Sequence, residues 1–350
     1  MEQDLKEIIN ISIFAPSGDN SQPWRFKIKN NIMLVYNVFE KDVSLYNFNM
    51  YASMVAIGAL LENIKISATH FGYICEIKIN NDLSKNLVAE CIFTRGSIEE
   101  DTLFKYIKER QTNRKPYKKD KISLDTINEL RGCKSFSEIN LKIISETESI
   151  KKLANICSIN EQIVLENKKL HDFLFEHITW TEEEDTIKKG FYIKTLELNG
   201  PQGLAFKLLR SWKINKLLNK IGISKFIARD NAKLYSQSGA ILAVTTNKMN
   251  QISFLKTGMF AQRLWLIATK YNIYMQPLTG IIFLNHRVND KNNQEQFEDE
   301  HVELIKTSYK KIEIIIESMG KFITIMFRLG YADKPSTRTK RQEAEIELER

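Results

Sequence analysis

The segment YASMVAIGALLENIKISATHF, residues 51–71, is nearly all apolar and predicts a buried helix at the centre of the fold. Gly72 follows this segment and predicts the end of the helix. The chain repeats the pattern at an offset of 200 residues in Gly258–Tyr271, where Gly258 corresponds to Gly58. Because a strand is expected directly after each helix, the sequence predicts two tandem copies of one α+β fold in one chain. Such a chain would behave as a fused dimer with a pseudo-two-fold axis.

The repeat places the first half at residues 1–115 and the second half at residues 116–350. Asn30-Asn31 lies between two apolar runs and predicts a β-hairpin in the first half. Further strands are expected at Tyr73–Ile79, Leu87–Thr94, Gly239–Thr245 and Phe322–Leu329, and further helices at Asp4–Phe14, around Leu103–Glu109 and at Phe297–Ser318. The end of the chain is charged, and we expect it to be frayed beyond about Gln342.

A helical insertion, at about residues 149–231, interrupts the second half. Gly200-Pro201 is expected to break it. Six apolar residues at helical spacing predict a face that packs as core: Leu204, Leu208, Leu209, Trp212, Leu217 and Leu218. A segment of this kind often covers a ligand site, so the insertion could also serve as a lid.

The stretch Arg110-Gln111-Thr112-Asn113-Arg114 lies where the first half ends and forms a compact motif for binding an anion. Arginine carries a planar fork of donors that stays charged at physiological pH. Thr112 adds a short donor that can reach the same phosphate or ring oxygen. The alternative interpretation is a solvated basic loop after a helix, because short basic motifs often match by chance.

Three other stretches carry groups that could contact a ligand. The loop from Ser17 to Trp24 is dense in hydrogen-bonding groups and suggests a wall for a flat, polar ligand. Met275–Gly280 contains a proline that fixes the chain and a glycine that lets the backbone approach a ligand closely. Pro335–Arg341 contains three cations and three hydroxyls, which suits a phosphate, although an ordinary basic tail would look the same.

Composition narrows the class of protein. Hydrophobic residues make up 43% of the chain and charged residues 27%, as in soluble globular proteins. No apolar run approaches the ~18 residues of a membrane span, and the N-terminus lacks the pattern of a signal peptide. The four cysteines are scattered and suggest reduced core residues of a cytoplasmic protein. The net charge of +8 is spread along the chain, which fits a small anionic ligand, or simply a solvated lysine-rich surface, better than nucleic acid. We expect neither nucleic acid nor a membrane as partner.

The sequence offers no set of catalytic side chains of its own. It contains no Gly-rich dinucleotide fingerprint, no phosphate-loop lysine motif and no nucleophile elbow. His171 and His177 are six residues apart, off a common helix face, so we expect surface residues rather than zinc ligands, and no metal site. If the protein is an enzyme, a bound cofactor should supply the chemistry.

Together these residues resemble the nitroreductase family of FMN-dependent enzymes, and within it the fused, single-chain branch related to the mycobacterial Acg protein. The match spans nearly the whole chain except the insertion. The family's proline-tryptophan loop is matched by Ser17, Asn20, Ser21, Gln22, Pro23 and Trp24. Its Arg-x-Ser-x-Arg motif is matched by Arg110, Thr112 and Arg114, with threonine in place of serine. Its Pro-Ile-Glu-Gly turn beside the flavin is matched by Pro277, Leu278, Thr279 and Gly280, and its basic C-terminal phosphate contact is similar to Arg338, Lys340 and Arg341.

The resemblance implies one FMN, held by these residues between the two halves, because the second copy has no proline-tryptophan loop. It implies NADPH or NADH as reductant and two-electron reduction of a nitro compound, a quinone or a similar small acceptor, with Arg114 and Thr279 tuning the flavin. Thr279 replaces the usual glutamate, and the insertion could exclude nicotinamide, so the alternative is a protein that binds or sequesters FMN with little turnover. A basic interaction protein with a dead site is the third possibility. A fused pseudo-dimer would be a monomer or would pair as a homodimer.

Overall fold

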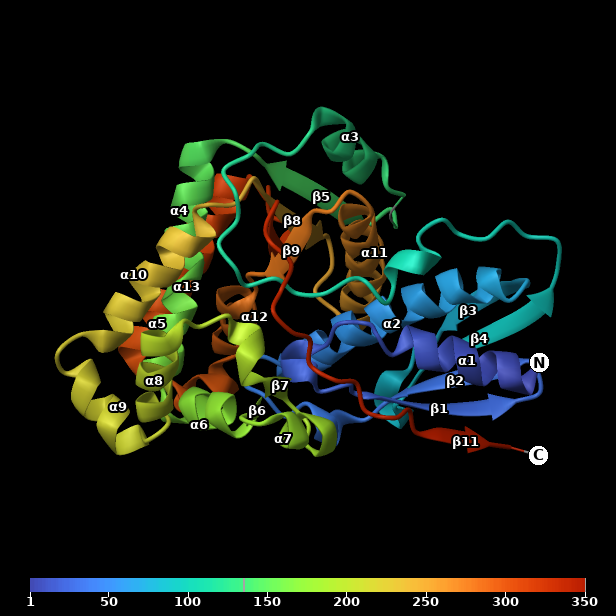
Figure 1. The fold of residues 1–350 in the computed structure, drawn as a ribbon, viewed down its shortest axis with the longest axis horizontal. Helices are drawn as coiled ribbons and strands as arrows, with labels where there is room; N and C mark the ends of the chain where they lie inside the picture. Colours follow the sequence, from blue (N-terminus) through green and yellow to red (C-terminus); the bar gives the residue numbers. More distant parts are fainter. Residues whose placement is uncertain (135, 350) are drawn as a thin grey trace.

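The protein is an α+β fold, as predicted, with two mainly antiparallel sheets and a helical region at one side (Figure 1). The structure is a computed structural model that describes residues 1–134 and 136–349. None of the described helices is both long and apolar enough to cross a membrane. The four cysteines are free thiols, with Cys91 and Cys157 buried and Cys75 and Cys133 half-buried.

The first sheet has five strands in the order β11-β1-β2-β4-β3. Their bounds are β1 Trp24–Lys29, β2 Ile32–Asn37, β3 Tyr73–Ile79, β4 Leu87–Arg95 and β11 Ile346–Leu348. The predicted hairpin is confirmed, because β1 and β2 pair antiparallel with Lys29 opposite Ile32. Asn30 takes the positive φ of 55° that the two-residue turn requires. Helix α1 (Glu2–Ser12) packs on helix α2 (Tyr51–His70), and α2 packs on β3.

The second sheet has four antiparallel strands in the order β5-β8-β10-β9. Their bounds are β5 Ile139–Ile144, β8 Ala240–Thr246, β9 Tyr274–Pro277 and β10 Phe322–Gly330. All seven residues of β8 are buried, since this strand is paired on both edges and covered on both faces. Its helices are α3 Leu124–Gly132, α11 Gln251–Lys270, α12 Gly280–Val288 and α13 Asp299–Ile316.

The two sheets repeat one topology. In each of them the chain runs through strand, strand, long helix, strand and strand, and these four strands lie in the order first, second, fourth, third. The insertion connects β5 to β8, at the place where a two-residue turn connects β1 to β2. This repeated topology supports the tandem arrangement that the sequence predicts, while the boundary at residue 115 stays a prediction.

The long helices α2 and α11 cross at a pair of glycines. A Cβ at Gly58 would lie 1.9 Å from the backbone oxygen of Leu255, and a Cβ at Gly258 would lie 2.1 Å from that of Val55. The two contacts are related by the same offset of 200 residues, since Val55 corresponds to Leu255. The repeated glycine is therefore required because the two helix backbones touch there.

The insertion folds into short helices and a two-stranded parallel pair, β6 Ile178–Thr179 and β7 Phe191–Tyr192. The helices are α4 Thr147–Cys157, α5 Ile159–Glu166, α6 Lys168–Glu176, α7 Glu182–Ile187, α8 Gly200–Leu209, α9 Trp212–Asn219 and α10 Ile223–Tyr235. Gly200-Pro201 begins α8 instead of breaking a helix, because Asn199 and Gln202 form a capping box around it. The predicted apolar core face is also wrong, since Leu209 is buried but Leu204, Leu208 and Leu217 are exposed.

Two expectations for loops also change. The segment around Leu103–Glu109 forms only a short 3₁₀ turn, Phe104–Tyr106. The C-terminal tail is not frayed: it crosses from the second half to the first, where β11 pairs in parallel with β1 (Figure 1). Backbone pairing and a hydrogen bond from the Gln342 amide to Gln22 Oε1 (3.2 Å) hold it there.

Candidate functional site

Two adjoining cavities lie where the first half, the second half and the C-terminal tail meet. A polar cavity of about 100 Å³ is lined mainly by arginines and threonines. An apolar cavity of about 240 Å³ lies between α2, α11 and the second sheet. The two share Pro16, Ser17, Asp19, Thr112 and Arg114 as common walls. Together they can take a molecule with an anionic end and a flat apolar end.

The arginine motif is held extended against the second sheet. Thr112 forms a parallel bridge with Met275, and the Asn113 amide donates to the Met275 carbonyl (3.2 Å). Alternation along this extended segment directs Arg110, Thr112 and Arg114 toward the polar cavity. Asn113 is buried on the other side and donates from Nδ2 to the Asp333 carbonyl (2.9 Å).

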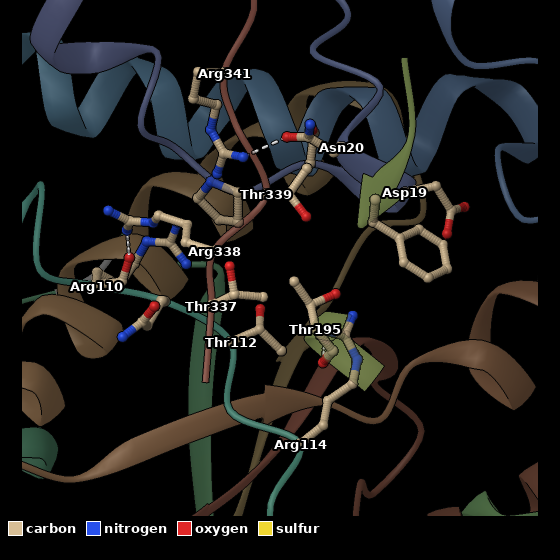
Figure 2. Close-up of a pocket in the computed structure, with 14 residues that line it drawn as sticks. Asp19, Asn20, Arg110, Thr112, Arg114, Thr195, Thr337, Arg338, Thr339 and Arg341 are labelled. Atoms are coloured by element: carbon tan, nitrogen blue, oxygen red, sulfur yellow. Dashed lines mark hydrogen bonds between the residues drawn. The ribbon is translucent and has the colours of Figure 1, made fainter. Parts of the chain in front are cut away.

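Three guanidinium groups gather at one side of the polar cavity, and Arg114 lies across from them (Figure 2). Arg110 donates to the Phe14 carbonyl (2.8 Å) and lies 4.5 Å from the centre of the Trp265 ring. Arg341 donates to the Ile13 carbonyl (3.0 Å). Arg338 donates to the carbonyl of Arg110. The arginines are thus oriented by backbone oxygens, which leaves their charge uncompensated.

The three arginines of this cluster have no close carboxylate partner in the part of the chain that the structure describes, although the charge of Asp185 acts on Arg341 from a longer distance. Within the described residues, Arg110, Arg338 and Arg341 form no ion pair with a carboxylate, and the buried Nε of Arg110 has no hydrogen-bond partner. Burial, together with repulsion from Arg338 and Arg341, holds the pKa of Arg110 well below its usual range. Burial, with Arg338 beside it, lowers the pKa of Arg341 to about 9. A bound anion would remove this electrostatic penalty.

The loop after α1 forms another wall of both cavities. Asp19, Asn20 and Gln22 take positive φ values of 47°, 56° and 48°, which make a tight turn, and Ser17 Oγ accepts from the Gln22 amide (3.0 Å). The Asn20 amide group donates to the carbonyls of Gly190 and Lys340, both at 3.0 Å. The loop therefore binds the insertion and the C-terminal tail at once. Burial raises the pKa of Asp19, against the opposing charges of His177 and Arg114.

The floor of the apolar cavity is formed by one face of each of the two long helices. Helix α2 contributes Ala52, Val55, Ala56 and Ala59, and α11 contributes Gly258, Ala261, Gln262 and Trp265. Both sets have the spacing i, i+3, i+4, i+7 that marks one helix face. Pro277 and Thr279 close the cavity from the second sheet. Thr279 is also the N-cap residue of α12, so the unpaired amides of a helix N-terminus begin at this wall.

Four of the residues predicted for the site do not line either cavity. Leu278 is buried in the core and its amide donates to the Met326 carbonyl (2.8 Å). The Cα of Gly280 faces the Asn160 side chain, whose Oδ1 lies 2.0 Å from where a Cβ would be, so the close approach at this glycine comes from the insertion. Lys340 is exposed and donates from Nζ to Thr186 Oγ1 (2.7 Å).

Gln22 is the fourth such residue. Its side chain is buried and accepts from the Gln342 amide, so it fixes the tail behind the cavity wall. The other predicted residues, Ser17, Asn20, Arg110, Thr112, Arg114, Pro277, Thr279, Arg338 and Arg341, line one or both cavities. The structure thus brings four separate stretches of the sequence to one place.

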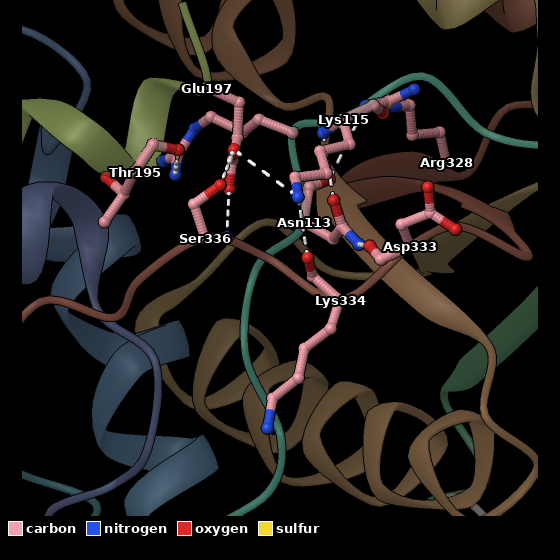
Figure 3. A network of polar contacts seen from close by, with 9 residues as sticks. Asn113, Lys115, Thr195, Glu197, Arg328, Asp333, Lys334 and Ser336 are labelled. Carbon is pink, nitrogen blue, oxygen red and sulfur yellow. Dashed lines mark hydrogen bonds and ion pairs between the residues drawn. The ribbon is translucent and has the colours of Figure 1, made fainter.

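A polar network ties the arginine motif to the tail and to the insertion (Figure 3). Lys115 Nζ donates to the Lys334 carbonyl (2.8 Å), and Glu197 accepts from both the amide and the hydroxyl of Ser336, each at 2.7 Å. Arg114 donates to the Thr195 carbonyl (3.2 Å). The three segments that border the polar cavity are therefore fixed to one another.

The insertion contributes to the polar cavity through Phe191 and Thr195, which the sequence analysis did not identify. Phe191 lies in β7, which pairs with β6, and Thr195 lies in the 3₁₀ turn that follows (Ile193–Leu196). This strand pairing leaves no local pattern in the sequence. His171 is buried rather than exposed, with Nε2 2.8 Å from the Leu209 carbonyl, and so it joins α6 to α8. Among the described residues, no group of three or more His, Cys, Asp or Glu is placed to hold a metal ion.

Arg328 is a third residue that could not be identified from the sequence motifs. It is fully buried on β10, donates from Nε to Gln276 Oε1 (2.7 Å) and from a terminal nitrogen to the Lys115 carbonyl (2.9 Å), and lies 3.9 Å from the centre of the Tyr117 ring. Gln276 lines the apolar cavity. Arg328 therefore orients a cavity residue from behind, and an arginine inside a predicted buried strand was the available signal.

No family model matches the chain. A curated protein of Mycobacterium tuberculosis, described as uncharacterized, is 20% identical over 343 residues, which is 97% of this chain and 47% of that protein. The chain therefore spans about half the length of the curated relative that it matches.

Several solved structures are similar to the chain at low TM-scores. A nitroreductase with bound FMN from Bacteroides fragilis has 10% identity and a TM-score of 0.37, and covers 69% of this chain and 94% of its own. An FMN-dependent nitroreductase from Mycobacterium smegmatis in complex with NADPH has 13% identity and a TM-score of 0.38, with coverage of 69% and 94%. Iodotyrosine deiodinase bound to FMN and 3-iodo-L-tyrosine has 13% identity and a TM-score of 0.37, with coverage of 69% and 96%. The two nitroreductases are described as members of the family that the sequence motifs resemble.

Proposed function

We propose that this chain binds one FMN across the two adjoining cavities and acts as a flavin-dependent oxidoreductase. The observation that carries the proposal is the cluster of Arg110, Arg338 and Arg341, which have no carboxylate partner among the described residues and lie at the polar end of an otherwise apolar cavity. Several buried positive charges close together repel one another, and an anion that binds among them removes this penalty. A ligand with a phosphate at one end and a flat ring at the other satisfies both cavities.

The residues fit the parts of FMN in turn. Arg110, Arg338 and Arg341 would hold the phosphate through charge-assisted hydrogen bonds. The hydroxyl of Thr112 and the side chains of Ser17 and Asn20 stand near the middle, where the ribityl hydroxyls would pass. Ala56, Ala59 and Trp265 would pack against the ring, and small side chains at the floor leave room for it.

Bound FMN would supply two-electron transfer, and the chain's own residues would bind it, orient it and set its electrostatic surroundings. Arg114 lies at the junction of the cavities and places a fixed positive charge beside the ring site. Thr279 places a neutral hydroxyl on the cavity wall. A carboxylate at this position would repel the negative charge that the ring gains on reduction. We infer that these two residues favour the reduced state of the cofactor, with NADPH or NADH as reductant and a nitro compound, quinone or similar small molecule as acceptor.

A second candidate function is the sequestration of FMN without turnover. The observation that favours it is the position of Phe191 and Thr195, which the insertion places on the cavity wall, with Arg114 bonded to the Thr195 carbonyl. If this wall does not open, bound FMN cannot leave through the polar cavity, and the protein would retain the cofactor. In both candidate functions the two halves of the chain would replace the two subunits of a dimer, so the protein could act as a monomer.

The test is the absorbance spectrum of the purified protein, followed under anaerobic conditions after NADPH or NADH is added. A yellow protein that bleaches within seconds supports the oxidoreductase. A yellow protein that stays yellow supports sequestration. A colourless protein that takes up no added FMN would contradict both.

A matched pair of double variants distinguishes the effect of the arginine cluster from that of losing two positive charges anywhere on the protein. Arg110→Ala with Arg341→Ala should weaken FMN binding by well over tenfold, because each lost charge-assisted contact to a buried anion costs about 1.5–3 kcal/mol. The control is Arg210→Ala with Arg229→Ala, since both of these arginines are exposed in the insertion. Equal FMN affinity in the two double variants would remove the arginine cluster from the site.

A further inference from the structure

The segment 200–229 has a one-sided charge composition. It contains seven basic residues and no Asp or Glu, although the whole chain carries 43 acidic residues among 350. The basic residues are Lys207, Arg210, Lys213, Lys216, Lys220, Lys225 and Arg229, and all seven are exposed. None of them forms an ion pair within the described part of the chain. The segment covers α8, α9 and the first half of α10, at the edge of the molecule farthest from the first sheet (Figure 1).

The same segment also exposes large apolar side chains. Six of them have exposed fractions between 40% and 82%: Leu204, Leu208, Ile214, Leu217, Ile221 and Phe226. Single exposed apolar residues are ordinary on protein surfaces, but six within 23 positions of one strongly basic segment are a contiguous feature of the sequence. Packing in the fold does not account for them.

Helix α9 turns two of its apolar residues outward, while Trp212 and Leu218 are half-buried against the insertion. Its inward side carries Asn215, which is fully buried, and Asn219, and both donate to the Leu165 carbonyl, at 2.7 and 2.6 Å. Ile214 and Leu217 are three positions apart and therefore share a different side, which is exposed to solvent. A helix that only packed on the protein would carry polar side chains on this solvent side.

The lysines of α9 border this outward apolar side. At 100° per residue, Lys213, Lys216 and the C-cap residue Lys220 fall on the arc next to that of Ile214 and Leu217, and the exposed Ile221 follows in the turn after the helix. An exposed apolar stripe beside a basic stripe is the pattern of helices that lie in the interface plane of a membrane. The apolar side chains enter the boundary between head groups and acyl chains, and the lysine stems extend to the head groups.

We propose that α8, α9 and the start of α10 dock on the surface of a bilayer that contains anionic phospholipids. Charge complementarity selects this partner: seven exposed cations with no acidic residue among them match a negatively charged surface. A second copy of the chain would bring seven cations against seven, which is repulsive. The apolar side chains are separated by lysines along three helices, an arrangement that suits a flat, fluid surface. The docking is peripheral, and it is an alternative to the expectation from the sequence that the protein has no membrane partner.

The proposal is tested by sedimentation of the full chain with vesicles, with no flavin required. The protein should pellet with vesicles of phosphatidylcholine and phosphatidylglycerol at low salt, and should remain in the supernatant with vesicles of phosphatidylcholine alone. High salt should release most of it, because screening weakens attraction between exposed charges. A protein that ignores anionic vesicles, or that binds both kinds equally, overturns the proposal.

Two matched pairs of variants locate the surface. Leu217→Ser with Ile221→Ser should weaken vesicle binding by about tenfold or more, whereas Leu124→Ser with Ile314→Ser, also exposed but elsewhere, should not change it. Lys216→Glu with Lys220→Glu should abolish binding, whereas Lys310→Glu with Lys311→Glu on α13 should retain it. All these positions are exposed, so the melting temperatures should stay equal. Loss in both members of a pair would overturn the assignment to this surface, as would binding of soluble polyglutamate without binding of vesicles, which would identify an acidic macromolecule instead.

Discussion

Arg110 is a charged residue placed where the fold gives it only uncharged acceptors. Its guanidinium is buried, donates to a backbone carbonyl and stacks on Trp265, while its Nε has no partner. Arg338 and Arg341 lie close enough to repel it. At this scale the site is a set of unfavourable charges that the folded chain retains, and an anion is the group that would make each of them favourable.

Inorganic phosphate should therefore raise the melting temperature of the flavin-free protein, because a ligand that binds only the folded state stabilises it by mass action. Burial lowers the pKa of Arg341 to about 9, so this stabilisation should weaken as the pH rises above 9 and the guanidinium loses its proton. The measurement is a thermal melt with and without phosphate at neutral and alkaline pH. Potassium chloride at equal ionic strength is the control, and an equal rise with chloride would show that the anion site is not specific.

His286 gives a prediction for pH dependence. It is buried among Tyr51, Phe254 and Tyr309, its Nε2 lies 3.0 Å from the Ile323 carbonyl, and burial lowers its pKa from 6.5 to about 4. Because the folded-state pKa lies below the unfolded value, the unfolded chain gains the proton first as the pH falls. The contribution of His286 to stability is therefore intact above pH 6.5 and is lost progressively down to pH 4, by about 3 kcal/mol.

The variant His286→Gln isolates this contribution, since glutamine keeps a donor for the carbonyl and does not titrate. Asp42 and Glu161, whose pKa values burial raises to about 6 and about 7, act in the opposite direction in the same range. They are present in both proteins and cancel in the difference. The free energy of unfolding of the wild type minus that of the variant should fall between pH 7 and pH 4 in urea titrations. A difference that stays constant over that range would refute the assignment.

At the scale of elements, the crossing of α2 and α11 permits only glycine at positions 58 and 258. Gly58→Ala should destabilise the protein by about 3 kcal/mol or more, because the added methyl would overlap the Leu255 carbonyl and the helices would have to separate. Gly203→Ala is the control, since this glycine is also in a helix but has open space around it. Alanine there should be neutral or stabilising by up to about 1 kcal/mol. Equal effects in denaturant titrations would mean that the helices do not touch at Gly58.

The long helices and the strands could be predicted from the sequence because their signals are local: apolar spacing, β-branched runs and turn residues. The same signals failed in the insertion. The spacing of Leu204, Leu208 and Leu217 predicts a helix face correctly but does not reveal whether another element covers it. For the site, the motifs located the arginines that gather at the polar cavity, whereas Phe191 and Thr195 reach the same cavity through long-range pairing that leaves no local pattern. Lys340 and Arg341 are adjacent basic residues, but their side chains point to opposite sides of an extended tail.

At the scale of the whole molecule, the tandem repeat has two places where a ligand could bind, and only one of them has the right walls. The apolar cavity uses Ala59 of α2 and Gln262 and Trp265 of α11. The counterparts at the offset of 200 residues are Met259, Glu62 and Lys65, and these three line a separate cavity of about 490 Å³. A small, a neutral polar and an aromatic side chain are thus replaced by a bulky apolar one and by two charged ones.

This second cavity also lacks a free cluster of arginines. Arg263 lies on its wall but pairs with Glu62 and with Asp101, the latter at 2.9 Å. At the offset of 200 residues, Arg263 and Glu62 correspond to Asn63 and Gln262, and these two are joined by a neutral hydrogen bond of 2.8 Å. One half of the pseudo-symmetric contact has therefore become an internal ion pair that closes the crossing, while the other half keeps an open, uncharged floor for a ring.

The chain should accordingly bind one FMN and not two. The ratio of flavin absorbance to protein, measured after saturation with FMN and gel filtration, should be one per chain, and the mass in solution should be that of a monomer if the two halves replace two subunits. Arg110→Ala with Arg341→Ala should reduce the ratio toward zero, since no second site remains to hold the cofactor. A ratio of two in the wild type, or a ratio of one that survives in the double variant, would mean that the cavity of Glu62, Lys65 and Met259 binds flavin after all.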